Sequence, residues 1–130
     1  FRTTATVSRY GPLDLYAMGL LGESEVPQAF YVESPSGASQ DRESPPRTGI
    51  AFTGTRREVS IEDVVAAMGP RNPPASRSPR THRQAWVYVV GRGRTADPAA
   101  VAKLETIRRA FESFFSDATG GRMSVETRLD

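Results

Sequence analysis

The sequence predicts a small α+β protein, in which about three helices pack against a mostly antiparallel sheet. Helices are indicated where apolar residues recur at three- and four-residue steps after good capping residues. Strands are indicated by short runs in which apolar side chains alternate along the chain. Long connections rich in Pro, Gly and Ser separate these segments. At 130 residues, the chain is long enough for one domain with a core and too short to predict two.

The first helix is expected within residues 10–21, after an extended lead-in. Pro12 suits the first helical position, because its fixed φ fits a helix and its missing N–H needs no partner there. Gly19 or Gly22 is expected to end this helix. Asp14 carries a carboxylate within this apolar run. Because burying a carboxylate alone is costly, we expect Asp14 to lie at an open edge, to be paired or to bind something.

The next part of the chain predicts short strands. A strand is expected at residues 29–32, followed by a long surface loop over residues 34–47 that is rich in Ser, Pro and charge. Two further strands are expected at residues 48–55 and 57–60, with a turn at Gly54 between them.

A second helix is predicted to start after Ser60, whose hydroxyl suits the N-cap, with Asp63 as its partner in an approximate capping box. Gly69 is expected to end this helix. A second proline-rich loop then runs over residues 71–81. The apolar stripe of the helix is Ile61, Val64, Val65 and Met68.

Residues 83–90 form the strongest strand pattern, and apolar groups on both faces predict a central strand covered on each side. Asp97 and Pro98 then predict a helix start. Phe115 falls off the main stripe of that helix and is expected to face a partner or polypeptide upstream of this chain. Residues 123–127 are expected to form a last strand. The stripe itself is Val101, Leu104, Ile107, Phe111, Phe114 and Ala118.

Composition excludes several classes of function. The chain has no cysteine, so it has no disulfide framework, thiol nucleophile or cysteine-based metal site. A formal charge of +2 favours neither nucleic acid nor a membrane surface, and no apolar run is long enough to cross a bilayer. His82 is the only histidine and has no sequence partner for catalysis or metal binding.

The run Tyr-Gly-Pro-Leu-Asp-Leu-Tyr-Ala-Met-Gly-Leu at residues 10–20, followed by Glu-Val-Pro at residues 25–27, carries a family resemblance. It resembles the segment downstream of the zinc site in a group of large, secreted bacterial metallopeptidase-like proteins. Further motifs that keep the same order are Thr55–Val65, Gly69–Arg71, Arg83–Val87, Ile107–Phe111 and Ala118–Arg122. The resemblance therefore covers nearly the whole chain.

In such proteins a helix with the pattern H-E-x-x-H lies upstream and supplies two zinc ligands and a general base. This chain contains no such motif. The resemblance implies that residues 1–130 are a single domain, or the C-terminal subdomain, of a secreted peptidase-like protein and are inactive alone. It implies no cofactor in this chain and zinc in the full-length parent. The implied partners are the upstream part of the same polypeptide and a peptide or protein substrate.

The resemblance also gives roles to three residues. With an upstream histidine pair, Asp14 would be a zinc ligand or would orient one. Tyr16 and Tyr10 would be hydrogen-bond donors to a tetrahedral oxyanion. The alternative is that Asp14 pairs with an arginine or caps local backbone donors. The two tyrosines would then be packing residues with their hydroxyls at the rim.

A second function remains open beside the peptidase-like one. The chain would then be a non-catalytic binding or interaction module, which uses the apolar surface of residues 10–21 or the arginine-rich residues 71–94. The interval between Asp63 and Asp97 contains no acid and six arginines, a pattern that also suits a phosphate backbone. Prolines break any continuous basic helix there, which argues against nucleic acid as the partner.

Overall fold

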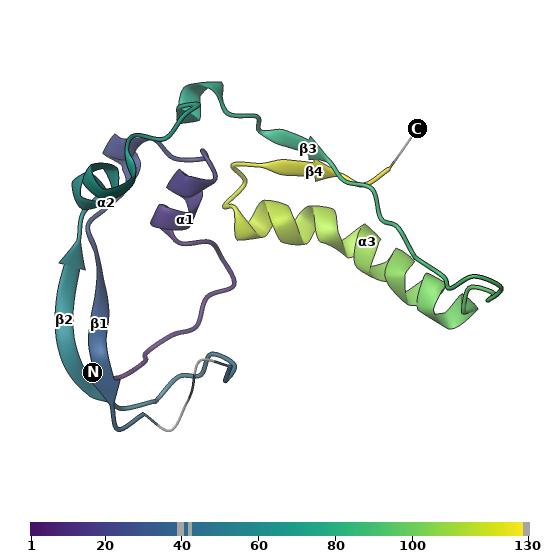
Figure 1. Ribbon diagram of the computed structural model, residues 1–130. Coiled ribbons are helices and arrows are strands. Elements are labelled where there is room, and N and C mark those ends of the chain that lie inside the picture. Colours follow the sequence, from purple (N-terminus) through teal and green to yellow (C-terminus); the bar gives the residue numbers. More distant parts are fainter. Residues whose placement is uncertain (39–40, 42, 129–130) are drawn as a thin grey trace. The chain divides into compact units, whose positions relative to one another are not determined.

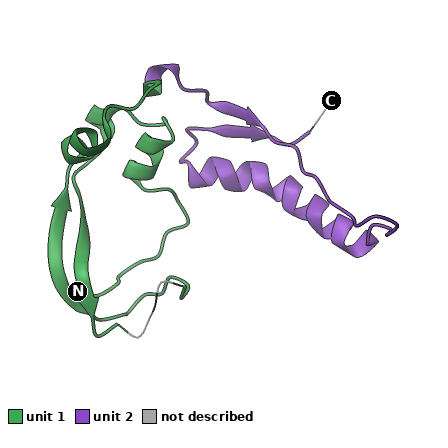
Figure 2. Ribbon diagram, viewed as in Figure 1, with its two compact units in different colours: residues 1–75 green, residues 76–130 purple. Residues whose placement is uncertain are grey.

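The computed structural model describes residues 1–38, 41 and 43–128. The chain divides into two compact units, residues 1–75 and 76–130 (Figure 2). Its class is α+β, as predicted from the sequence (Figure 1). The helices are α1 (Pro12–Ala17), α2 (Ile61–Met68) and α3 (Pro98–Ala118), with short 3₁₀ turns at Glu23–Glu25 and Ala75–Arg77. The strands are β1 (Ala29–Ser36), β2 (Thr53–Val59), β3 (Thr81–Arg83) and β4 (Ser124–Glu126).

Within unit 1, β1 and β2 form an antiparallel pair that runs from Ala29 opposite Val59 to Glu33 opposite Thr55. The predicted turn at Gly54 and the two separate strands around it are wrong, because β2 passes through this position without a break. A Cβ atom at Gly54 would lie 2.4 Å from a side-chain carbon of Val32. Glycine is therefore required at this point by close approach of the two strands, not by a turn.

The core of unit 1 forms where α1, α2 and the chain after α1 meet. Tyr16, Leu21 and Ile61 are buried together, and Val64 and Val65 of α2 pack against them. Helix α1 is shorter than predicted, because it ends at Ala17. A longer helix was predicted because the apolar run continues to residue 21. Its last residues, Leu20 and Leu21, lie after the end of the helix and are buried in the core.

The caps of α2 follow the sequence prediction. Ser60 Oγ accepts a hydrogen bond from the Asp63 N–H at 3.2 Å, and Asp63 Oδ2 accepts from the Ser60 N–H at 2.9 Å. Gly69 then adopts a positive φ of 80°, which glycine reaches without steric cost, and the helix stops.

Unit 2 is a βαβ arrangement, in which α3 connects two parallel strands. Thr81 pairs with Ser124, and Arg83 pairs with Glu126. Helix α3 begins as predicted, since Asp97 Oδ1 accepts from the Ala99 N–H at 2.9 Å. Strand β4 also forms within the predicted range. The sheet content thus differs in detail from one mostly antiparallel sheet: it consists of one antiparallel and one parallel pair.

One prediction for unit 2 needs correction. The central strand over residues 83–90 is wrong, because β3 ends at Arg83 and residues 85–90 have no neighbouring strand in the described part of the chain. Phe115, which falls off the predicted stripe, is half-buried, and its ring lies 5.7 Å from the Phe111 ring. Phe114 is instead 57% exposed. The face of α3 that packs inward is therefore rotated toward Phe115.

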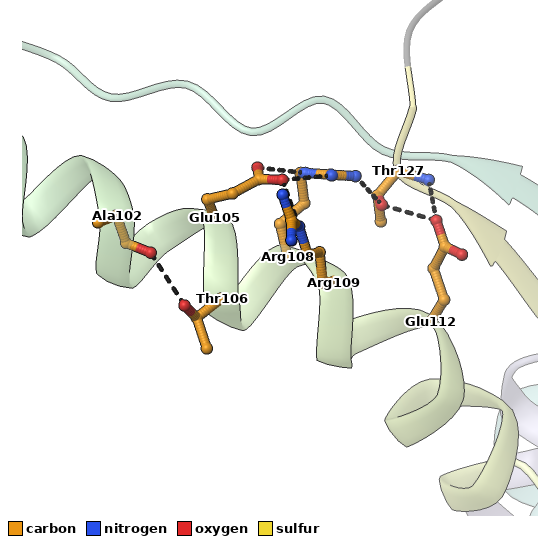
Figure 3. A network of polar contacts seen from close by, with 7 residues as sticks. All are labelled: Ala102, Glu105, Thr106, Arg108, Arg109, Glu112 and Thr127. Carbon is orange, nitrogen blue, oxygen red and sulfur yellow. Dashed lines mark hydrogen bonds and ion pairs between the residues drawn. The ribbon is translucent and has the colours of Figure 1, made fainter.

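A polar network fixes α3 to β4 (Figure 3). Thr127, directly after β4, donates from both its N–H and its hydroxyl to Glu112 Oε1 at 2.8 and 2.7 Å. Arg108 Nη1 donates to the Thr127 hydroxyl at 2.8 Å and holds Glu105 with two further hydrogen bonds. Arg109 donates to Glu105 as well. Charged hydrogen bonds of this kind are stronger than neutral ones.

This network predicts that acid weakens unit 2. Hydrogen bonds from Arg108 and Arg109 lower the pKa of Glu105 from 4.5 to about 2, and hydrogen bonds from Thr127 lower the pKa of Glu112. A carboxyl with a lowered pKa in the folded state stabilises that state above its unfolded pKa. This contribution is lost as the pH falls from 4.5 to about 2. Helix content measured by circular dichroism during thermal unfolding should therefore show a falling melting temperature over this interval.

The matched variants are Glu105→Gln, which removes one of the titrating groups, and Glu62→Gln, which changes a surface carboxyl on α2. Glu105→Gln should flatten the pH dependence, whereas Glu62→Gln should leave it unchanged. The effect is modest because the groups are solvent-accessible and screened. A pH profile of Glu105→Gln that matches the original chain would contradict this account.

Candidate functional site

Two cavities of unit 1 lie beside the phenol of Tyr16. The first has a volume of about 350 Å³ and the second about 260 Å³, and Tyr16 and Arg71 line both. The first cavity is further lined by Leu21, Gly22, Glu23, Ser24, Pro74 and Ala75. The second is further lined by Leu13, Ala17, Val64, Met68, Gly69 and Pro70. Polar groups therefore gather around the first cavity and apolar groups around the second.

Tyr16 is positioned by α1, whose inner face carries its ring into the core, where the side chain is 7% exposed. Its hydroxyl accepts a hydrogen bond from the Arg71 N–H at 3.1 Å and donates to Glu23 Oε1 at 3.4 Å. Both capacities of a buried phenol are thus used, as is usual for tyrosine.

Arg71 links this phenol to the end of α1. Its Nε donates to the Ala17 carbonyl at 2.9 Å, and its Nη1 donates to the Pro73 carbonyl. The last carbonyls of a helix have no partner within the helix, and a cation near them is favoured by the helix dipole. Arg71 therefore caps the C-terminal end of α1 and also holds the chain after α2 through the Pro73 carbonyl.

The lining gives this site a defined chemistry. Around the first cavity, Glu23 presents a carboxylate, Ser24 belongs to the lining, and Arg71 presents a guanidinium. This set is able to hold a polar or charged group by hydrogen bonds.

Asp14 lies at an open edge, which is one of the placements expected from the sequence. It is exposed, and its Oδ2 accepts the Gly11 N–H at 2.9 Å. A carboxylate in the first turn of a helix is stabilised by free N–H groups and by the helix dipole. Of the two alternatives drawn from the sequence, capping of local backbone donors is the contact that is present.

The structure does not bring the three predicted site residues together on one face. Asp14 is exposed and Tyr16 is buried, since residues two apart on a helix point to nearly opposite sides. Tyr10 precedes the helix and is 43% exposed. Within residues 1–38, 41 and 43–128, no group of three or more His, Cys, Asp or Glu residues is placed to hold a metal ion. His82 is exposed on β3.

Sequence reasoning missed Glu23 and Arg71 as the partners of Tyr16. Arg71 is 55 residues away from Tyr16 and was counted only as one charge of a basic loop. The signal in the sequence that could have indicated Arg71 is its position directly after Gly69 and Pro70, which end α2 and restrict the backbone there. Among the described residues, no helix is long and apolar enough to cross a membrane.

Removing the phenol oxygen should weaken unit 1. In Tyr16→Phe, the Arg71 N–H and Glu23 lose their partner, and a net loss of about 1 kcal/mol is typical for such a contact. Urea unfolding should report this decrease in the free energy of unfolding. Tyr31→Phe is the matched control, because Tyr31 is an exposed tyrosine on β1. Equal losses in both variants would show that the Tyr16 contacts contribute no stability of their own.

Comparisons of the chain with protein-family models, with curated proteins and with solved structures gave no match.

Proposed function

We propose that the chain is the non-catalytic C-terminal portion of a secreted bacterial zinc metallopeptidase-like protein and that it packs against the upstream part of that polypeptide. The resemblance of residues 10–20 and of the motifs that follow them supports the peptidase-like part of this proposal. The observation that carries the packing part is the amount of surface that the chain leaves exposed.

That surface is unusually large for the mass. The chain exposes 10029 Å² at 14.2 kDa. Folded monomers of this mass expose about 6,800 Å², and two separate bodies of half the mass expose about 8,200 Å² together. Even if the two units are treated as independent bodies, the excess is roughly 1,800 Å², which exceeds the area that one partner buries in a standard interface, about 800 Å².

Much of the exposed surface is apolar and lies in both units. Met68 on α2 is 84% exposed, and Phe30 and Tyr31 on β1 are half-exposed. In unit 2, Val87 and Phe114 are exposed. Single exposed apolar residues are ordinary, but runs of them mark surfaces that another protein part covers. This pattern supports a chain that completes its fold against further polypeptide.

In this proposal a histidine pair of the upstream part would hold the zinc ion, and a glutamate there would act as the base. Bound zinc would supply the activation of water for peptide hydrolysis. Asp14 is the residue of this chain that suits a contact with the metal, because its carboxylate is exposed and its Oδ2 alone accepts from Gly11. Tyr16 has a structural role, since its hydroxyl already joins Arg71 and Glu23. The two cavities beside Tyr16 would then contact the substrate or the upstream part.

Zinc binding tests this proposal. Calorimetric titration of the 130-residue chain alone should show no tight zinc binding, and Asp14→Ala should behave as the original chain does. A longer polypeptide that includes the upstream part should bind zinc and hydrolyse peptides. Asp14→Ala in that polypeptide should lower the zinc affinity by roughly tenfold or more, as losses of supporting carboxylates do.

Glu62→Ala, a surface acid on α2, is the matched control and should leave the zinc affinity of the longer polypeptide unchanged. The proposal fails if the chain alone binds zinc and Asp14→Ala abolishes that binding. It also fails if the longer polypeptide contains no H-E-x-x-H pattern and binds no zinc, in which case the interaction module becomes the function.

One observation favours that second function. Residues 85–90 lie beyond β3 without a neighbouring strand among the described residues, and the apolar side chains of residues 87–90 are exposed. Such a segment is suited to recognition by another polypeptide, whether or not a peptidase lies upstream.

A further inference from the structure

Unit 2 contains the beginning of a parallel sheet that is not completed by the described residues. Strands β3 and β4 pair in parallel, and α3 connects them as the crossover helix. Parallel sheets occur almost only with several strands and with both faces covered, and isolated two-stranded sheets are marginal. The open places are the second face of the sheet and its two edges.

The chain after β3 keeps the direction of a strand. It runs along α3 as an extended segment (Figure 1). Exposure alternates along it: Trp86 is half-buried, with its ring edge-on to Phe111 at 5.4 Å, whereas Val87 is 77% and Val89 is 83% exposed. Alternation with a period of two is the signature of an extended strand, and here the side chain of Trp86 is turned toward α3.

The edge of this segment that faces away from β4 can be assigned from the contacts of the residues before it. The Gln84 N–H donates to the Glu126 carbonyl at 2.9 Å, and the Ser124 N–H donates to the Arg80 carbonyl at 2.8 Å. The backbone groups of Arg80 and Gln84 therefore point toward β4. Those of Ala85, Val87 and Val89 point to the opposite edge, because N–H and C=O directions alternate along a strand.

In the part of the chain that the structure describes, we find no backbone hydrogen bond from residues 85–90 to another residue. The indole N–H of Trp86 is also buried without a partner there. Buried donors are normally satisfied, and a row of unpaired backbone groups is a template for another strand. The unpaired backbone groups of residues 85–90 point to a strand that is supplied by another polypeptide.

We propose that residues 85–90 accept an extended segment of another polypeptide as an added β-strand and that this segment carries acidic residues at its ends. Backbone hydrogen bonds to the edge formed by Ala85, Val87 and Val89 would hold it, as in other cases of strand addition. The exposed valines supply apolar contacts beside it.

Charge distinguishes this occupant from a second copy of the chain. Arg92 and Arg94 follow the segment directly, and no acid lies between Asp63 and Asp97. If two copies paired antiparallel through Val87, Arg80 of one copy would lie near Arg92 and Arg94 of the other, and like charges across strands are destabilising. A strand with glutamate or aspartate at its ends pairs favourably with the same arginines.

The probe is a synthetic peptide in which Val and Thr alternate between terminal glutamates, titrated into the full 130-residue chain. Trp86 is the only tryptophan, so its fluorescence reports events at this segment. We expect a saturable change, together with slower hydrogen exchange at the Val87 and Val89 amides. The same peptide with terminal lysines should bind more weakly at low salt, and the difference should shrink as salt is added.

The decisive variant is Val87→Pro, which removes an N–H from the free edge but none from the side that faces β4. Proline is tolerated at such edge positions, and circular dichroism checks that the fold is retained. Peptide affinity should fall at least tenfold, whereas Val87→Ala, which keeps the N–H, should retain most of it.

Three results would overturn the proposal. The first is the absence of saturable peptide binding. The second is equal affinity of Val87→Pro and Val87→Ala for the peptide. The third is dimerisation of the chain, seen by sedimentation and lost in Val87→Pro, which would assign the edge to a second copy. None of these readouts depends on zinc or on peptidase activity, so the proposed function is tested separately.

Discussion

Burial of apolar side chains is the interaction on which this structure depends, and the described part of the chain buries few of its large apolar side chains and exposes many. The core of unit 1 gathers around Tyr16, Leu21 and Ile61. In unit 2 the buried apolar residues are Ala118, Met123 and Val125. Hydrophobic burial is the dominant favourable contribution to folding, so cores of this size stabilise a chain weakly. The large exposed surface and the unpaired backbone of residues 85–90, as far as the described residues go, follow from this one shortage.

Polar contacts hold each unit in shape where the core is thin. In unit 1, Arg71 joins the phenol of Tyr16 to the last carbonyl of α1. In unit 2, Glu112 and Arg108 attach the end of β4 to α3 through Thr127. Such contacts fix geometry more than they add stability, because each replaces hydrogen bonds to water. Tyr16 and Arg71 also line the two cavities, so the residues of the candidate site also stabilise the fold of unit 1.

The sequence predicted correctly those features that depend on residues close together in the chain. Ser60 with Asp63, and Asp97 with Pro98, gave helix starts that the structure confirms, because a cap is formed within a few residues. Residues 83–90 failed as a central strand, since a strand exists only beside a partner and the pattern cannot say whether one is present. The hydrogen-bond partner of Tyr16 could not be predicted either, because Arg71 is 55 residues away in the sequence. Asp14 was judged by its apolar neighbours in sequence, yet a short helix turns it outward to its own backbone.

Dependence on further polypeptide is the central claim, and urea unfolding of the isolated chain tests it most directly. The account predicts a free energy of unfolding below about 5 kcal/mol, the lower end for ordinary domains, and a clear rise when the same residues are joined to the upstream part that the proposed function requires. A cooperative transition of the isolated chain well within the range of about 5–15 kcal/mol, unchanged by the upstream part, would contradict it.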